Sequence, residues 1–207
     1  MKKFRIIYIT SVVFLLNICF ITCINPDRYI YIDQETKDYC LFGQGSYWIY
    51  QDSATLEIDS VVINNPIIYE LDKSKGYSTE FNENYQTNIL SYSVDSAYSI
   101  ITGLHSGYTC NKSDLFSCLW GYHVIYHNGK INTTCEYYRN TILIDKKDNY
   151  SINGVDYSNV KIFKSSEYGE QLFYWSKHVG LIRTEKHKNN SITVKNLIKY
   201  NVKPYNN

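Results

Sequence analysis

Apolar and polar residues alternate along much of the chain from about residue 39 onward. Two such runs, 45–52 and 57–63, flank a short polar stretch and predict a β-hairpin. Residues 67–71 and 88–101 predict further strands, the second with serine and tyrosine in alternation. Successive side chains of a strand point to opposite faces of a sheet, so a period of two favours strands over helices.

Two Asn-Gly pairs mark reversals of the chain. Asn128-Gly129 lies between two runs of β-forming residues, and Asn153-Gly154 separates 150–152 from 155–163. A two-residue type I′ turn needs positive φ at both central positions, which Asn and Gly adopt most readily. Each pair therefore predicts a tight hairpin.

The remaining pattern predicts a sheet with little helix. Residues 172–175 and 179–185 predict a third hairpin, and 191–202 predicts a closing strand. Residues 112–119 alone look helical, with Ser113 as a candidate N-cap. Successive hairpins without long helical patterns predict an all-β or β-dominated fold, a single antiparallel meander sheet with at most a short helix.

Composition supports the sheet and narrows the function. The 207 residues include 22 tyrosines, and the two alanines are Ala54 and Ala97. Tyrosine suits a pleated surface, whereas alanine is the best helix former. The 21 basic and 20 acidic side chains are balanced. Nucleic-acid binders depend on clustered Lys and Arg, so we expect no nucleic-acid partner.

The N-terminus has the pattern of an export signal. Lys2, Lys3 and Arg5 precede an uncharged, largely apolar run over 6–26. Within it, Phe20-Ile21-Thr22-Cys23 resembles a bacterial lipobox, with Phe where Leu is usual and Thr where a smaller residue is usual. The resemblance implies that Cys23 is lipidated.

Other fates of the N-terminal segment stay open. Cys19 is an alternative lipidation site, and a run of about 20 apolar residues is also long enough for an uncleaved anchor. We predict a signal peptide over 1–22, a tether over 23–38 and a single β-rich domain over 39–207; the segment 24–37 could instead be a first edge strand. The domain is then extracytoplasmic, anchored by lipid to a bacterial membrane, and faces either the periplasm or the cell surface.

Four cysteines follow Cys23, at positions 40, 110, 118 and 135. An even number in an oxidising compartment permits two disulfides, and Cys110 with Cys118 is the nearest pair. The alternative is that all four stay reduced and pack as small apolar residues. The short Cys-x-x-Cys spacing of zinc sites is absent, so no metal is predicted from the cysteines.

The candidates for catalysis and metal binding are weak. On a strand, His123 and His127 would lie about 13 Å apart, too far for one ion. Glu57 and Asp59 would share a strand face at about 6.6 Å, a separation that glycoside hydrolases use, but a solvated strand face has the same pattern. No P-loop or nucleophile-elbow motif is present. We therefore assign no catalytic residue, no metal and no cofactor.

Aromatic residues provide the candidate binding surface. They could line a sugar- or lipid-binding face, or fill the core between strands with hydroxyls at its rim. The candidates are Trp48, Tyr50, Trp120, Tyr122, Tyr174 and Trp175.

Two segments carry a resemblance to a known family. Residues 45–53 (GSYWIYQDS) and 174–183 (YWSKHVGLIR) resemble small uncharacterised lipoproteins of Bacteroidota, a resemblance that implies no activity. Residues 179–182 are also similar to a strand of half-barrel proteins that bind lipid acyl chains, which implies a curved half-barrel. Three Asp-Ser-apolar triplets resemble the O-glycosylation acceptors of Bacteroidota and imply modification at Ser53, Ser60 and Ser96.

These patterns predict a membrane-anchored lipoprotein with a structural or interaction role. The first alternative is a module that binds an apolar, lipid or carbohydrate ligand. The second is a hydrolase whose carboxylates the sequence does not identify. An apolar cavity would favour a lipid carrier, and convergent carboxylates in a polar cleft would favour the hydrolase.

Overall fold

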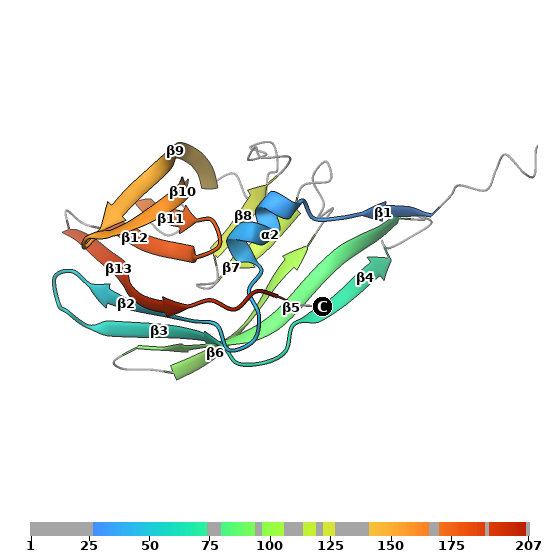
Figure 1. Cartoon of the computed structure of the whole chain (residues 1–207), viewed down its shortest axis with the longest axis horizontal. Coiled ribbons are helices and arrows are strands. Elements are labelled where there is room, and N and C mark those ends of the chain that lie inside the picture. The colour runs from blue at the N-terminus through green and yellow to red at the C-terminus, as the bar shows by residue number, and fades with distance from the viewer. Residues whose placement is uncertain are drawn as a thin grey trace, which may run out of the picture.

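The protein folds around one large, mostly antiparallel sheet (Figure 1). The computed structural model describes residues 27–73, 80–93, 97–105, 114–118, 122–126, 141–165, 170–188 and 191–205. Across these residues the sheet runs β8-β7-β6-β5-β3-β2-β13-β12-β11-β10-β9, and β1 and β4 pair with β5 outside this path. Over the described strands this path is open, with β8 at one end and β9 at the other. The predicted β-dominated class is confirmed.

The described residues form thirteen strands and one helix. The first half of the chain contains β1 Arg28–Ile30, α2 Gln34–Cys40, β2 Tyr47–Asp52, β3 Ile58–Ile63, β4 Ile68–Lys73, β5 Glu80–Tyr92 and β6 Ala97–His105. The second half contains β7 Asp114–Cys118, β8 Tyr122–Tyr126, β9 Thr141–Ile152, β10 Val155–Ser165, β11 Glu170–Ser176, β12 Gly180–Lys188 and β13 Ser191–Asn201.

Three of the predicted local features are confirmed. Strands β2 and β3 form the first hairpin, and β11 and β12 form the third. Between β9 and β10, Asn153 has φ +51° and Gly154 has φ +81°, as a type I′ turn requires. The predicted strand over 88–101 is two strands, because β5 ends at Tyr92 and β6 begins at Ala97. Asn128-Gly129 lies outside the described residues.

The predicted helix over 112–119 is wrong. Residues 114–118 form β7, which pairs with β6 on one side and β8 on the other. The backbone hydrogen bonds of two neighbouring strands outweigh a weak helical pattern with one N-cap candidate. The described helix is α2, within and just beyond the segment predicted as a tether. Strand β1 in that segment pairs in parallel with the start of β5.

Strand β13 joins the two halves of the sheet. It pairs with β2 on one side and β12 on the other, and its register with β2 shifts between Leu197 and Lys199. Such an irregularity bends a strand and increases its twist. Figure 1 shows the β9–β12 half folded over the β2–β3 half. The side chains of β2 reach β12 and the turn before it, because Tyr50 OH donates to Leu181 O at 2.8 Å and Trp48 Nε1 to Val179 O at 2.6 Å.

The core fills the space between these layers, and half of its buried apolar residues are aromatic. Its buried residues form two clusters. One contains Phe42, Trp48, Tyr50, Val61, Ile63, Ile89, Ile152, Tyr157, Val160, Ile162, Tyr174, Ile182 and Leu197. The other contains Ile32, Tyr39, Tyr85, Phe163, Phe173, Trp175 and Leu181. Burial of these side chains is the main stabilising contribution to the fold.

Candidate functional site

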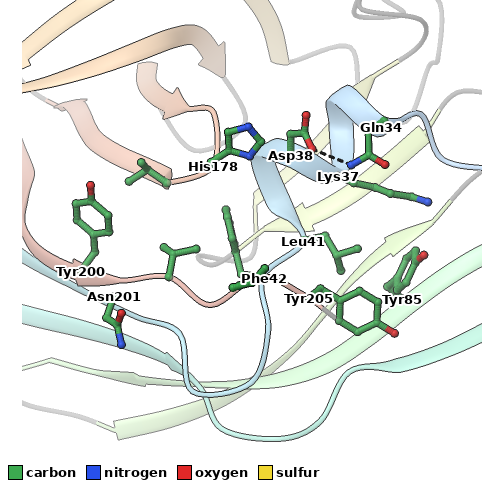
Figure 2. A pocket seen from close by; sticks show the side chains of 13 residues that line it. Gln34, Lys37, Asp38, Leu41, Phe42, Tyr85, His178, Tyr200, Asn201 and Tyr205 are labelled. Atoms are coloured by element: carbon green, nitrogen blue, oxygen red, sulfur yellow. Dashed lines mark hydrogen bonds between the residues drawn. The ribbon is translucent and has the colours of Figure 1, made fainter. Parts of the chain in front are cut away.

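A pocket of about 730 Å³ lies where helix α2, the β11–β12 turn and the C-terminal segment meet (Figure 2). Its lining combines aromatic rings, aliphatic side chains and planar polar groups. The lining residues are Gln34, Lys37, Asp38, Leu41, Phe42, Tyr85, His178, Val179, Tyr200, Asn201, Val202, Pro204 and Tyr205. They come from distant parts of the sequence, so the pocket exists only in the folded sheet.

Helix α2 begins at a well-formed N-cap. The Asp33 carboxylate accepts hydrogen bonds from Thr36 N at 3.0 Å and Thr36 Oγ1 at 2.8 Å. An aspartate at this position satisfies one of the free N–H groups of the first turn. The helix is seven residues long, too short to be stable alone, so its position depends on tertiary contacts.

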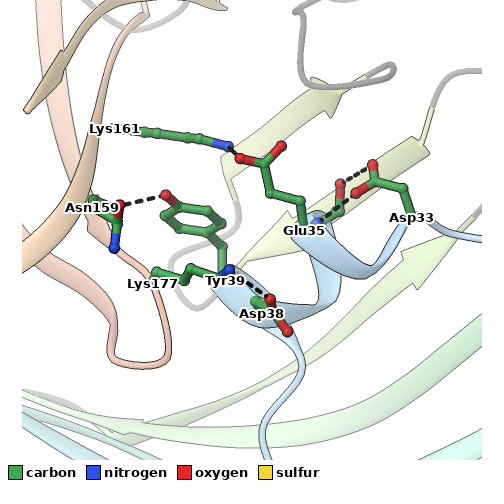
Figure 3. Close-up of polar contacts among 8 residues, drawn as sticks. Asp33, Glu35, Asp38, Tyr39, Asn159, Lys161 and Lys177 are labelled. Carbon is green, nitrogen blue, oxygen red and sulfur yellow. Dashed lines mark hydrogen bonds and ion pairs between the residues drawn. The ribbon is translucent and has the colours of Figure 1, made fainter. Parts of the chain in front are cut away.

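Asp38 is the carboxylate of the pocket and is held from two sides. Gln34 Nε2 donates to its Oδ1 at 2.8 Å, and Lys177 Nζ lies 3.0 Å from its Oδ2 (Figures 2 and 3). Burial raises its pKa, but the bonds from Gln34 and Lys177 outweigh burial and the net pKa is lowered. Asp38 is therefore ionised at neutral pH.

His178 lies at the turn between β11 and β12, opposite α2. Its φ is +60°, a conformation uncommon for a residue with a side chain. The His178 N–H donates to the Asp38 carbonyl oxygen at 2.7 Å, which fixes the turn against the helix. The imidazole is exposed at the pocket mouth and lies near Asp38 (Figure 2).

The C-terminal segment forms the opposite wall. Gly43 N donates to Lys203 O at 2.7 Å, and Lys203 N donates to Ser46 Oγ at 2.9 Å. A Cβ at Gly43 would lie 2.6 Å from Pro204 O, so this approach requires glycine. Tyr205 packs edge-on against Tyr85 with ring centroids 5.3 Å apart. A second hollow of about 620 Å³ shares Pro204 and Tyr205 with the pocket.

A buried carboxylate beside the pocket connects α2 to β5. Glu83 accepts hydrogen bonds from Ile32 N at 2.7 Å, Lys37 Nζ at 2.8 Å and Tyr85 OH at 2.7 Å. The pKa of Tyr85 is raised by burial first and by its bond to Glu83 second, so the phenol stays protonated. Three donors compensate the loss of water around the carboxylate.

A second polar cluster holds the other side of α2 against β10 (Figure 3). Lys161 Nζ lies 2.7 Å from Glu35 Oε1 and 4.3 Å from the centroid of the Tyr39 ring. The Tyr39 hydroxyl donates to Asn159 O at 2.8 Å. Burial lowers the pKa of Lys161, and the Glu35 carboxylate opposes that shift. This cluster positions the helix and does not line the pocket.

The carboxylates considered for hydrolysis do not form a pair. Glu57 is exposed and precedes β3, whereas Asp59 is buried and forms an ion pair with Lys195. Among the residues that line the pocket, Asp38 is the one carboxylate and none is a serine, threonine or cysteine. The two-carboxylate arrangement of glycoside hydrolases is therefore not formed by these groups.

The aromatic residues singled out from the sequence are core residues wherever the structure describes their side chains. Trp48 and Tyr50 are fully buried, and Trp175 and Tyr174 are 3% and 8% exposed. The tyrosines that line the pocket, at positions 85, 200 and 205, were not singled out. Nothing in their local sequence separates them from the other tyrosines. Trp120 lies outside the described residues, and Tyr122 begins β8.

Of the predicted modification sites, the described serines Ser53 and Ser60 do not line the pocket. Ser53 is exposed in the β2–β3 turn and accepts a hydrogen bond from Asn196 Nδ2 at 3.0 Å, and Ser60 is half-buried in β3. Cys118 ends β7, and Cys40, at the end of α2, is a free thiol. Cys23, Cys110 and Ser96 lie outside the described residues, so lipidation, the disulfide and glycosylation stay predictions.

The described ranges hold no group of three His, Cys, Asp or Glu side chains that could bind a metal ion. His123 lies in β8, and His127 is outside those ranges. None of the helices described is long and apolar enough to span a membrane.

Comparison with known proteins gives a single distant likeness to report. No protein-family model matches the chain, and no curated protein does. A solved structure described as a "putative lipoprotein from Parabacteroides distasonis" aligns with 78% of this chain and 99% of its own. The aligned residues are 12% identical and the TM-score is 0.44.

Proposed function

We propose that this protein is an extracytoplasmic lipoprotein, anchored to a bacterial membrane through Cys23, that binds a carbohydrate in the pocket beside α2. The observation that supports a binding role is the composition of that pocket. Exposed Tyr200 and His178 line it, and the polar side chains of Asp38 and Gln34 lie on its α2 side. These groups offer donors, acceptors and ring faces together.

A binding site for a sugar needs both polar groups and aromatic rings. Its hydroxyls donate to carboxylates and accept from amides, and its C–H faces pack on aromatic rings. Asp38 and Gln34 supply planar polar groups, and Tyr200 and Tyr205 supply rings. This chemistry supports a carbohydrate as the proposed ligand class.

The alternatives have less support. A carrier of acyl chains needs an enclosed apolar cavity, whereas the two described core clusters fill the space between the layers with side chains. A hydrolase of the two-carboxylate type needs a second carboxylate beside Asp38, and the lining supplies none. A purely structural role would leave the pocket without a ligand, and the binding experiment below tests that outcome.

The anchor is tested separately from the ligand. Replacing Cys23 with Ser should move the protein from the membrane fraction to the soluble fraction and abolish incorporation of labelled fatty acid. Cys19→Ser is the matched control, and it should leave both readouts unchanged. Continued acylation of the Cys23→Ser protein would disprove lipidation at Cys23.

The ligand class is tested by screening the Cys23→Ser protein on an array of defined oligosaccharides and measuring each hit by titration calorimetry. His178→Ala and Tyr200→Ala should each weaken binding about tenfold or more, the loss expected for a hydrogen bond or a ring contact. Tyr92→Ala is the control, since Tyr92 is 43% exposed and does not line the pocket. No binding to any glycan, or equal binding by all variants, would contradict the proposal.

A further inference from the structure

The start of β5 and its two neighbours form a three-stranded flap that extends from the body of the protein (Figure 1). Strand β1 pairs with β5 on one side, and β4 pairs with it on the other. Tyr29 and Lys73 are both register partners of Phe81. Register partners point to the same face of a sheet, so these three side chains share one face.

On the outer strands of the flap, β1 and β4, that face is aromatic and exposed, whereas Glu83 and Tyr85 of β5 on the same face are buried beside α2. Tyr29 stacks on Phe81 with ring centroids 5.2 Å apart, and Tyr31 stacks on Tyr29 at 6.3 Å. Further along the same face, Leu71 pairs with Glu83 and Tyr69 with Tyr85. The exposed fractions are 47% for Tyr29, 59% for Tyr31, 40% for Tyr69 and 37% for Leu71. Adjacent exposed apolar groups of this kind mark an interaction surface.

The opposite face of the flap is mainly polar. Asp72 pairs with Asn82 and Glu70 with Asn84 across β4 and β5. The Asn84 Nδ2 donates to Asp72 Oδ2 at 2.9 Å. The flap is therefore amphipathic, which suits a boundary between water and a less polar medium.

The position of the flap indicates which medium that is. Strand β1 begins at Arg28, five residues after Cys23. Five residues span at most about 18 Å. Because β1 and β5 run parallel, both begin at the free end of the flap, beside the stacked pair Tyr29 and Phe81. A lipid on Cys23 would hold this end within that distance of the bilayer.

We propose that the aromatic face of the flap, Tyr29, Tyr31, Phe81, Leu71 and Tyr69, lies in the headgroup region of the membrane that carries the anchor. Tyrosine fits this region, since its ring packs among the upper acyl carbons and its hydroxyl stays in water. The inference rests on the proposed lipidation of Cys23. It adds a second membrane contact that fixes the orientation of the domain.

Hydroxyl-radical footprinting of the full-length lipoprotein tests this orientation. The protein is reconstituted in phosphatidylethanolamine–phosphatidylglycerol vesicles and compared with the Cys23→Ser protein in buffer, with tyrosine oxidation read by mass spectrometry. Tyr29 and Tyr31 should be oxidised about fivefold more slowly in vesicles, the change expected if roughly half-exposed rings become about one-tenth exposed. Tyr92 and Tyr200, exposed elsewhere, should be oxidised at the same rate in both samples.

The outcomes of this experiment distinguish the proposed lipid anchor at Cys23 from the proposed docking of the aromatic face. The intact mass shows whether the mature N-terminus is acylated, and an unacylated protein overturns both the anchor and the docking. An acylated protein whose Tyr29 and Tyr31 react equally in vesicles and in buffer overturns the docking alone. Protection of the same tyrosines in the Cys23→Ser protein as its concentration rises would instead show self-association and also overturn the docking. Tyr29→Ser with Tyr31→Ser should restore fast oxidation at Tyr69 without loss of acylation.

Discussion

At the scale of single residues, a few polar side chains organise the turns that hold the strands in register. Asp52 is 6% exposed at the end of β2, and its Oδ1 accepts hydrogen bonds from Ala54 N at 2.8 Å and Thr55 N at 2.9 Å. Bonds to an ionised carboxylate are stronger than bonds to a neutral acceptor. The pKa of Asp52 is lowered, by the Thr55 backbone bond first and against the effect of burial.

This carboxylate predicts a pH-dependent contribution to stability. The folded pKa lies below the ordinary value of 3.8, so the contribution is complete above that pH and is lost as the pH falls through the folded pKa. Asp52→Asn keeps an acceptor but removes the charge, and it should lower the free energy of unfolding by about 1 kcal/mol at pH 7. The difference from the parent should shrink below about pH 4.

Thermal unfolding between pH 7 and pH 3 measures this effect. Asp148→Asn is the control, since that side chain is exposed on β9, and it should leave the melting temperature unchanged throughout. A deficit in the Asp52→Asn protein that stays constant down to pH 3 would contradict the assignment.

At the scale of elements, helix α2 depends on the strands it contacts. Glu83 accepts three hydrogen bonds that connect Ile32, Lys37 and Tyr85. Glu83→Gln removes the charge opposite Lys37 and replaces one acceptor with a donor facing existing donors. Mismatched buried groups of this kind cost about 2–4 kcal/mol.

Hydrogen–deuterium exchange provides the measurement. In the Glu83→Gln protein the amides of 34–40 should exchange faster, while those of β2 and β13 change less. Glu70→Gln, an exposed carboxylate on the neighbouring strand β4, should leave both regions as they are in the parent. Uniform acceleration along the whole chain would show that Glu83 stabilises the entire fold and not the helix in particular.

The hairpins were predictable from sequence because their determinants are local. Asn153-Gly154 specifies a turn whatever surrounds it, and the alternation in 45–52 fixes which side chains enter the core. Helix α2 was not predictable, because seven residues with an N-cap at Asp33 become helical through contacts with β5 and β10. The same limit explains why the helix predicted over 112–119 is wrong, since the partners of β7 are β6 and β8.

The pocket was not predictable for a related reason. Asp38 and Tyr200 come from opposite ends of the described chain, and both line the pocket only because β13 lies in the middle of the sheet. His178 gave no signal either, since its positive φ is imposed by the turn and by its bond to Asp38. The register of non-neighbouring strands, which creates the site, is not contained in any local pattern.

At the scale of the whole molecule, the two halves of the sheet depend on one strand. Leu197 of β13 is 2% exposed and belongs to the core cluster shared by β2, β10 and β12, whereas the adjacent Ile198 is 45% exposed. Leu197→Ala should lower the free energy of unfolding by about 2–4 kcal/mol, because it leaves a cavity between the layers. Ile198→Ala should change it by less than about 0.5 kcal/mol.

Denaturant titration followed by circular dichroism and tryptophan fluorescence tests whether this effect is global. Both probes should shift together in the Leu197→Ala protein, since Trp48 and Trp175 report on different core clusters. Separate transitions would mean that the halves of the sheet unfold independently, contrary to a shared core at β13.

The parallel pairing of β1 with β5 has a mechanical consequence. Tension applied to the chain ahead of Arg28, along the direction of the strand, would slide β1 lengthwise past β5. In that geometry the hydrogen bonds of the pair share the load, whereas a strand peeled from its end breaks them in succession. A protein attached to a membrane at this end would thus resist a pulling force on its N-terminal segment better than a pairing of three residues suggests.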